Sequence, residues 1–155
     1  MTAVPEPRTP VFRRAVIALN GGPSDARIVR LACALARGTH AELIAVHVVE
    51  IDWTLPLDAD VAGHSEEAQR VLDMAEAVAE ESKTTLEPVL LQARDVGAAL
   101  VDEASERGAD LLIVGLPYRK RFGGDFAIGK TIPYVLKNAP CAAWVVRDPI
   151  REEIP

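Results

Sequence analysis

The sequence predicts an α/β protein, a doubly wound five-stranded parallel sheet with strand order 3-2-1-4-5 and helices on both faces. Short apolar runs alternate with longer amphipathic stretches along the chain, which is the pattern of consecutive βαβ units. The short runs are apolar throughout rather than at every second position, as expected when helices cover both faces of a parallel sheet. With right-handed crossovers, the winding of such a sheet reverses between its first and fourth strands.

The first strand and helix are predicted within residues 15–38. The apolar run 15–19 (AVIAL) indicates a buried strand, which ends at the chain breaker 20–23 (NGGP). Ser24 and Asp25 then begin a helix, because short polar side chains favour helix amino termini. Gly38 ends this helix, whose apolar residues recur at helical spacing as Ile28, Leu31, Ala32, Leu35 and Ala36.

A long connection separates the second strand from the second helix. Residues 43–49 (LIAVHVV) predict the strand, whereas residues 51–63 show no periodicity and predict a loop. Residues 65–67 (SEE) cap the helix that follows. Its apolar stripe repeats every 3.6 residues and consists of Ala68, Val71, Leu72, Ala75, Val78 and Ala79.

The third and fourth strands differ in composition. Residues 87–92 (EPVLLQ) predict a strand at an edge of the sheet, because Pro88 cannot donate a ladder hydrogen bond. Asp95 caps the next helix, which Gly108 ends. Residues 110–115 (DLLIVG) are almost entirely apolar and predict a central strand.

The C-terminal part predicts a loop, a short helix and the last strand. A basic, glycine-rich loop spans residues 116–130 and leads to a helix over 131–139, with Thr131 as its cap. Pro140 breaks this helix, and residues 142–146 (AAWVV) form the fifth strand. The residues of the helix that we expect to face inward are Ile132, Val135, Leu136 and Ala139.

Length and charge limit the possible functions. The 155 residues predict one domain over residues 12–149, preceded by a proline-rich, charged and disordered tail over residues 1–11. No segment approaches the roughly 18 apolar residues of a membrane span, and the N-terminus does not resemble a signal peptide, so we expect a cytoplasmic protein without membrane insertion. A net charge of −6 disfavours nonspecific binding to nucleic acid.

Glycine-rich turns follow both strands at which the winding reverses. Residues 20–22 (NGG) come directly after the first strand, and residues 123–129 follow the fourth strand. In sheets of this kind, ligands bind outside the carboxyl ends of those two strands. Fold and composition therefore predict one binding site at this point.

Residues 124–131 (GDFAIGKT) match the phosphate-loop pattern G-x-x-x-x-G-K-[ST]. Three features oppose a nucleotide hydrolase. Eight residues separate the strand from Gly124, Pro133 places the helix start at Thr131, and a single strand follows to supply a Mg²⁺-binding carboxylate. We predict a binding protein rather than an enzyme, with weak ATP hydrolysis as the least favoured alternative. Two interpretations stay open for the loop, an anion-binding site at a helix N-terminus or a structural turn.

These residues together resemble the universal stress protein family over residues 12–147. The strongest similarity is ADLLIVG, a glycine-rich loop, Gly129 and then VLKNAPCAAWVV. The resemblance implies an adenine nucleotide alpha hydrolase-like fold and a homodimer formed through the last strand, Ala142 to Val146. It also implies a small phosphate-bearing ligand, ATP or another adenine nucleotide such as AMP or a cyclic nucleotide, with Mg²⁺ bound only together with the nucleotide.

The resemblance also implies a set of site residues with departures from the pattern Gly-x₂-Gly-x₉-Gly-[Ser/Thr]. Tyr118 stands at the second glycine, ten residues rather than nine precede the third, and Lys130 replaces the hydroxyl residue. Asn20 stands where the family often has aspartate, and Val48 matches the position that packs against the base. The predicted site consists of Leu19, Asn20, Gly21, Val48, Val114, Gly115, Tyr118, Gly124, Gly129, Lys130 and Thr131.

The departures leave a second function open, a regulatory or protein-interaction domain that acts without nucleotide. The stretch 122–141 also resembles stress-protein domains appended to amino-acid permeases, which implies a membrane transporter as a possible partner. In that case the basic run 119–121 (RKR) would face the partner.

Overall fold

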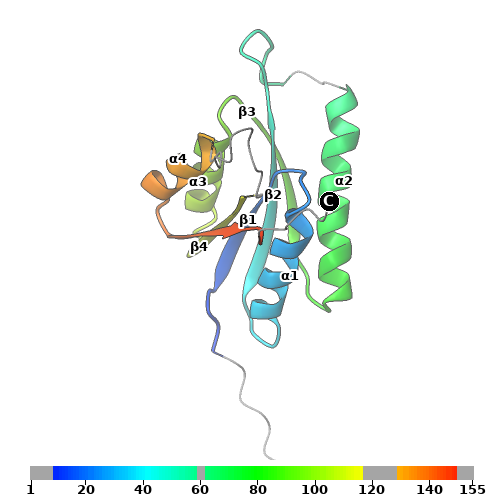
Figure 1. The fold of residues 1–155 in the computed structure, drawn as a ribbon, viewed down its shortest axis with the longest axis vertical. Helices are drawn as coiled ribbons and strands as arrows, with labels where there is room; N and C mark the ends of the chain where they lie inside the picture. Colours follow the sequence, from blue (N-terminus) through cyan, green and yellow to red (C-terminus); the bar gives the residue numbers. More distant parts are fainter. Residues whose placement is uncertain (1–8, 59–61, 117–128, 150–155) are drawn as a thin grey trace, which may run out of the picture.

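The computed structural model of the protein describes residues 9–58, 62–116 and 129–149, and the side chains of residues 62–65 are not part of that description. It contains a five-stranded sheet in the order β3 (Glu87–Ala93), β2 (Glu42–Glu50), β1 (Arg14–Leu19), β4 (Leu111–Leu116) and β5 (Ala142–Arg147). Every neighbouring pair of strands is parallel. The predicted fold class and strand order are confirmed, including the place of β3 at an edge (Figure 1).

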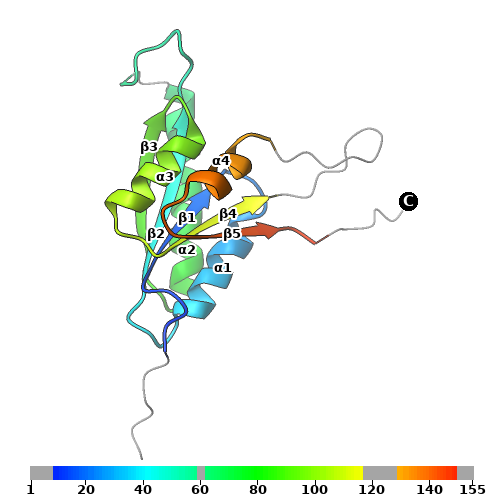
Figure 2. The same cartoon turned by 90° about the vertical axis from the view of Figure 1, so that its left-hand side faces the viewer.

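Helices cover both faces of the sheet. Helices α1 (Asp25–Ala36) and α2 (Ala62–Glu81) pack on one face, and α3 (Val96–Glu106) and α4 (Thr131–Asn138) pack on the other (Figure 2). This arrangement places one apolar core on each side of the sheet. Because helices cover both faces, the strands are apolar on both sides. This pattern in the sequence is what predicted the α/β fold.

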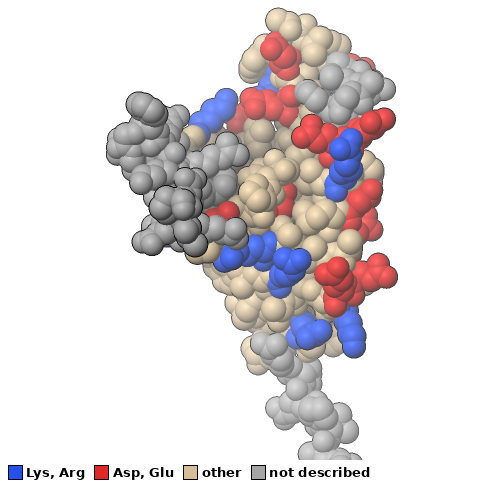
Figure 3. Space-filling view, turned by 45° about the vertical axis from the view of Figure 1, so that its right-hand side comes forward, with Lys and Arg blue, Asp and Glu red and all other residues tan. Residues whose placement is uncertain are grey.

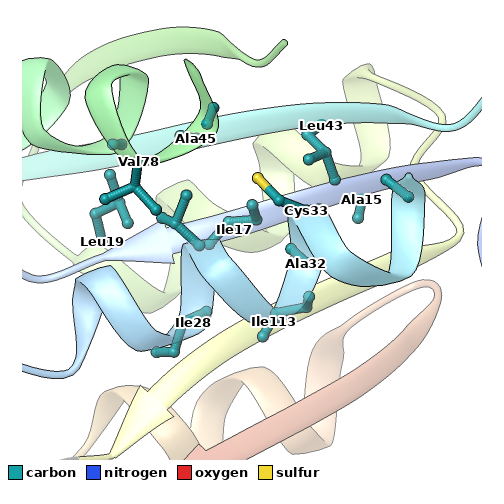
Figure 4. Packing of buried hydrophobic residues seen from close by; sticks show 14 of the residues in the cluster. Ala15, Ile17, Leu19, Ile28, Ala32, Cys33, Leu43, Ala45, Val78 and Ile113 are labelled. Carbon is teal, nitrogen blue, oxygen red and sulfur yellow. The ribbon is translucent and has the colours of Figure 1, made fainter. Parts of the chain in front are cut away.

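Alternation along the strands divides the side chains between the two cores. In β1, Ala15, Ile17 and Leu19 face α1 and α2, whereas Val16 faces α3. Figure 4 shows Ile17 and Ile113 beside Ile28 and Ala32 of α1. Ile17, Ile28 and Ile113 are fully buried, and burying a side chain of this size contributes about 1.5–3 kcal/mol. The α1/α2 core thereby fixes α1, whose first residues follow the glycine-rich turn.

Helix α2 begins at Ala62, three residues before the predicted cap at residues 65–67. The prediction was wrong because no proline precedes the polar residues, so the helix can extend through them. The predicted stripe is confirmed, since all six of its apolar residues are buried. Asp95 caps α3 as predicted, because its side chain accepts a hydrogen bond from Ala98 N.

Helix α4 differs from its prediction in two respects. Lys130 is the N-cap and Thr131 is the first helical residue, because the Lys130 carbonyl already accepts a hydrogen bond from Tyr134 N. Leu136 was expected to face inward but is 58% exposed. Ile132 and Val135 occupy the buried face, and the next residue points about 100° away from Val135. Leu31 of α1 was likewise placed in the apolar stripe of its helix, but it is 38% exposed and lies at the margin of that stripe.

Near the N-terminus, Phe12 is 3% exposed and belongs to the α1/α2 core. The domain over residues 12–149 stays a prediction. The prediction of a disordered tail concerns residues 1–11, of which 1–8 lie outside the described residues. No helix in the described part of the chain has the length and hydropathy required to span a bilayer.

Candidate functional site

The carboxyl end of β1 is set back from the ends of its two neighbours. Leu19, the last residue of β1, pairs with His47, whereas β2 continues for three more residues to Glu50. On the other side, Ala18 pairs with Val114, and β4 continues to Leu116. The turn after β1 therefore lies between two strands that extend further at this edge, at the point where the winding of the sheet reverses. We call this region the carboxyl-end site and define its described residues as Asn20, Gly21, Val48, Gly115, Gly129 and Lys130.

A buried carboxylate shapes the turn after β1. Asp25, 1% exposed, accepts hydrogen bonds from Asn20 N at 3.1 Å and Gly21 N at 2.8 Å. The Asn20 Oδ1 atom in turn accepts from Gly22 N at 2.7 Å. Gly21 has a φ of +82°, a conformation that glycine adopts at little cost. Three hydrogen bonds and one glycine thus fix the turn.

Burial raises the pKa of Asp25 above its ordinary value, although the N–H groups of Asn20 and Gly21 act in the opposite direction. The fold therefore keeps a carboxyl group at this position despite its desolvation. The sequence analysis assigned Asp25 only to the start of α1. The acceptor of the turn amides was missed, because its partners depend on how the turn folds back over the helix.

His47 lies beneath the same turn. Its Nδ1 atom is 2.9 Å from the Leu19 carbonyl oxygen, so this nitrogen carries a hydrogen and donates it to that carbonyl. A Cβ atom on Gly21 would lie 4.0 Å from His47 Cε1. The half-buried imidazole thus supports the end of β1.

Ser24 ties the start of α1 to the chain after β5. Its side chain does not cap α1; instead the Oγ atom donates to Asp148 Oδ2 at 2.6 Å. Asp148 N donates to the Leu116 carbonyl at 3.1 Å. The ends of β4 and β5 are thereby joined to the turn after β1. This contact spans 124 positions of sequence, so local patterns could not reveal it.

The two described glycines predicted to cradle phosphate differ in their surroundings. A Cβ atom on Gly115 would lie 2.3 Å from Ile28 Cδ1, so this glycine permits the close approach of β4 and α1. Gly129 has a φ of +73°, and no atom of the described residues lies within 4 Å of a Cβ position there. Packing alone therefore explains Gly115, whereas no described residue packs against Gly129 at the start of α4.

Lys130 introduces a positive charge at the N-terminus of α4. Its Nζ atom lies 3.8 Å from Glu50 Oε1, and the two side chains are 78% and 54% exposed. The first turn of a helix offers backbone N–H groups to an anion, except at Pro133, which has none. Acidic side chains gather along α2 (Figure 3), whereas Lys130 places a cation at the start of α4.

The other predicted residues are buried, begin α4 or lie outside the described residues. Leu19, Val48 and Val114 are 4%, 8% and 2% exposed, so these three residues mainly form the floor of the carboxyl-end site. Thr131 begins α4 beside Lys130. Tyr118 and Gly124, together with the basic run 119–121, lie outside the described residues. Within the described ranges, His, Cys, Asp and Glu side chains form no group of three that could hold a metal ion.

A cavity of about 480 Å³ lies at the opposite, amino end of the sheet. Both arginines that line the cavity already lie close to carboxylates. Arg14 Nε is 2.7 Å from Glu42 Oε2, and Arg13 lies beside Asp110. The polar groups that converge on the reversal point of the sheet make the carboxyl end the better candidate for a ligand site. The cavity is lined by Pro10, Arg13, Arg14, His40, Ala41, Glu42 and Gly108.

Comparison with known proteins gives consistent results. Residues 12–147 match the model of the universal stress protein family. The universal stress protein MJ0531 of Methanocaldococcus jannaschii is 24% identical over 148 residues, which cover 92% of this chain and 86% of that protein. The sensor protein KdpD of Mycobacterium tuberculosis is 33% identical over 116 residues, or 75% of this chain. The match spans only 12% of the length of KdpD.

Solved structures share the fold. The universal stress protein from Archaeoglobus fulgidus in complex with dAMP superposes with a TM-score of 0.68 at 20% identity, covering 88% of this chain and 98% of that chain. A universal stress protein in complex with cAMP gives a TM-score of 0.61 at 22% identity, covering 88% and 97%. At these identities the similarity establishes the common fold.

Proposed function

The chain belongs to the universal stress protein family, and from that premise we propose that it binds an adenine nucleotide at the carboxyl-end site. The observation that carries the proposal is the turn after β1, which a buried carboxylate fixes at the reversal point of the sheet, opposite a lysine at the start of α4. Relatives of the same fold are described in complex with dAMP and cAMP. The ligand class therefore agrees with both the place and the charge of the site.

In this proposal each part of the site has a distinct task. The Asn20-Gly21 turn and the peptide groups beside Val48 contact the base or ribose, because they lie at the ends of β1 and β2. Gly129, Lys130 and Thr131 contact the phosphate, since free N–H groups and the helix dipole favour an anion there. ATP, AMP and cyclic nucleotides all carry the required groups, with Mg²⁺ entering only on the phosphates of a nucleotide.

We further propose that the protein is a binding module and not a nucleotide hydrolase. The phosphate-loop pattern requires its lysine inside the loop and helix turn that follow a strand directly. Here Lys130 comes fourteen positions after Leu116, the last residue of β4, and it caps an eight-residue helix. Phosphate release that depends on Lys130 in the presence of Mg²⁺ would contradict this part of the proposal.

Calorimetric titration tests the binding proposal. We expect ATP, AMP or cAMP to bind the wild type with a dissociation constant below about 1 mM, which corresponds to about 4 kcal/mol. The substitution Lys130→Ala should weaken binding, whereas Lys137→Ala in the last turn of the same helix removes the same charge away from the site and should not. If none of the three nucleotides binds the wild type below about 1 mM, the proposal is wrong.

A homodimer through β5 is a further part of the proposal. β5 is an edge strand, and its residues are half-buried or exposed rather than buried. An unpaired edge offers N–H and C=O groups to a second copy. A proline at a position of β5 whose N–H points away from β4 would remove one of these donors, and sedimentation should then show a larger fraction of monomer.

A second candidate function is regulation through a protein partner. The similarity to a segment of KdpD favours it, because a domain of this kind there forms part of a much longer sensor protein. A transporter or its regulator would then be the partner of this chain. Copurification of such a partner with both the wild type and the Lys130→Ala variant, without bound nucleotide, would favour this candidate over nucleotide binding.

A further inference from the structure

The pair formed by Lys130 and Glu50 joins the two sides of the carboxyl-end site. Glu50 is the last residue of β2, and Lys130 is the N-cap of α4. Their charged atoms are 3.8 Å apart, so the lysine proposed to meet phosphate is directed toward a carboxylate on the β2 side. Local sequence patterns do not reveal Glu50, because its proximity to Lys130 depends on β2 extending further than β1 at this edge.

Register places Glu50 beside the position proposed for the base. Leu19 pairs with His47, so Glu50 lies three residues beyond the end of β1. Val48 and Glu50 are two positions apart, and their side chains therefore leave β2 on the same face. That face carries the core of α3 and α4, to which Val48 and Ile132 belong. A nucleotide between the β1 turn and α4 would thus have Glu50 at its edge.

The pair is weak enough for a ligand to break. Both side chains are more than half exposed, and exposed ion pairs contribute little to stability. When a phosphate group pairs with Lys130, Glu50 loses this contact. The Glu50 carboxylate then faces an anionic ligand, and no cation among the described residues is paired with that carboxylate. Repulsion between that carboxylate and the ligand grows with each further negative charge on the phosphate chain.

We propose that Glu50 is a specificity-determining residue, which competes with phosphate for Lys130 and disfavours nucleotides in proportion to their negative charge. This inference rests on the proposed nucleotide binding. Glu50 itself need not contact the base, because its effect is exerted on Lys130 and on the phosphate chain. Its consequence is a bias against triphosphates relative to monophosphates and cyclic monophosphates.

The test compares adenosine, AMP and ATP on the wild type and on Glu50→Gln by calorimetry. The glutamine keeps the shape and removes the charge, so the affinity for AMP should rise about two- to fivefold, the range typical of an exposed ion pair. The gain for ATP should be at least twice that for AMP, and adenosine should be unaffected. Raising the salt concentration should reduce the gains, because exposed charges are screened.

Glu42→Gln is the matched control. Glu42 begins the same strand and pairs with Arg14 at 2.7 Å, so the substitution removes an equal charge and breaks an ion pair at the far end of β2. It should leave all three affinities unchanged. In a Lys130→Met background, Glu50 no longer has a lysine to compete for. The gain in affinity that AMP and ATP share on Glu50→Gln should therefore disappear.

Failure of the inference differs from failure of the proposed function. If AMP or ATP binds the wild type but Glu50→Gln changes neither affinity, or changes adenosine equally, the role of Glu50 is wrong and nucleotide binding stands. An equal response to Glu42→Gln would also overturn it, because the effect would then come from net charge. If no nucleotide binds the wild type below about 1 mM, both proposals fail.

Discussion

Two aspartates at opposite ends of the sheet each accept hydrogen bonds from two consecutive backbone N–H groups, but their pKa values shift in opposite directions. At the amino end, Asp110 accepts from Arg13 N at 2.8 Å and Arg14 N at 2.9 Å. At the carboxyl end, Asp25 accepts from Asn20 N and Gly21 N. Partial burial acts to raise the pKa of Asp110, but the hydrogen bonds from the N–H groups of Arg14 and Arg13 outweigh it, and the pKa is lowered. Burial dominates at Asp25 and raises its pKa.

The difference separates a structural end of the sheet from the end at which we propose that the ligand binds. Asp110 is exposed, and its hydrogen bonds, which join β1 to β4, outweigh the effect of partial burial on its pKa. Asp25 is 1% exposed, and the fold accepts its desolvation in return for a fixed turn at the proposed ligand site. A titratable group kept in an unfavourable environment is more common at functional sites than elsewhere.

Ion pairs follow the same division. At the amino end, Arg14 meets Glu42 at 2.7 Å and Arg107 meets Glu87 at 2.7 Å, which joins neighbouring elements at hydrogen-bond distance. At the carboxyl end, Lys130 and Glu50 are 3.8 Å apart and share no hydrogen bond by distance. The charges of the carboxyl end are therefore the ones that a ligand can recruit.

The largest effect is expected from Asp25→Ala. Removing the carboxylate leaves the N–H groups of Asn20 and Gly21 without their acceptor, and the loss should be about 2–3 kcal/mol of unfolding free energy. Because the same turn is proposed to contact the nucleotide, affinity for AMP should fall at least tenfold. Urea denaturation and calorimetry measure the two quantities.

Asp110→Ala is the matched variant at the amino end. Water can reach the N–H groups of Arg13 and Arg14, so the expected loss is about 1 kcal/mol, and nucleotide affinity should stay unchanged. The contrast between the two ends is contradicted if Asp110→Ala weakens AMP binding as much as Asp25→Ala does.

A second, smaller effect distinguishes the two glycines of the site. Gly115→Ala places a methyl group 2.3 Å from Ile28 Cδ1, and overpacking of this kind costs about 1–3 kcal/mol. The double variant Gly115→Ala, Ile28→Val removes the methyl group that is in the way and should recover part of the loss. Gly129→Ala meets no atom of the described residues and should lose only about 1 kcal/mol through its left-handed backbone. No recovery in the double variant would refute the packing explanation for Gly115.

Sequence patterns predicted the elements well because the required information is local. Each strand is an apolar run next to a breaker such as residues 20–23, and the edge position of β3 follows from Pro88. Given the element order, right-handed crossovers leave few topologies, so the strand order could also be predicted. The errors concern helix boundaries and the margins of buried stripes, at the start of α2, at Leu31, at Thr131 and at Leu136, where tertiary packing decides the boundary and the buried face.

The site was predicted less completely because its contacts are not local. Asn20, Gly21 and Lys130 lie beside glycine-rich turns and could be proposed from composition. Glu50 is only the last polar residue of an apolar run, and its role depends on the register between β1 and β2. Asp148 likewise gains a partner, Ser24, only when β4 and β5 end side by side with α1.

The smallest effect is a difference in pH dependence between the two aspartates. The folded-state pKa of Asp25 lies above the ordinary value of 3.8. As pH rises from 3.8 through that raised pKa, the unfolded chain ionises first, so stability falls across this window and then levels off. The isosteric variant Asp25→Asn cannot ionise. The wild type should therefore lose stability relative to Asp25→Asn as pH rises through this window in urea denaturation.

Asp110 should show the opposite sign in the same experiment. Its folded-state pKa lies below 3.8, so its contribution is fully present above pH 3.8 and is lost as pH falls through the lowered pKa. Relative to Asp110→Asn, the wild type should therefore gain stability as pH rises through that lower window. Subtracting each asparagine variant from the wild type cancels the groups that titrate in both proteins. Two curves of the same sign would mean that burial does not separate the two carboxylates, and the division between a structural and a functional end of the sheet would then lose its electrostatic basis.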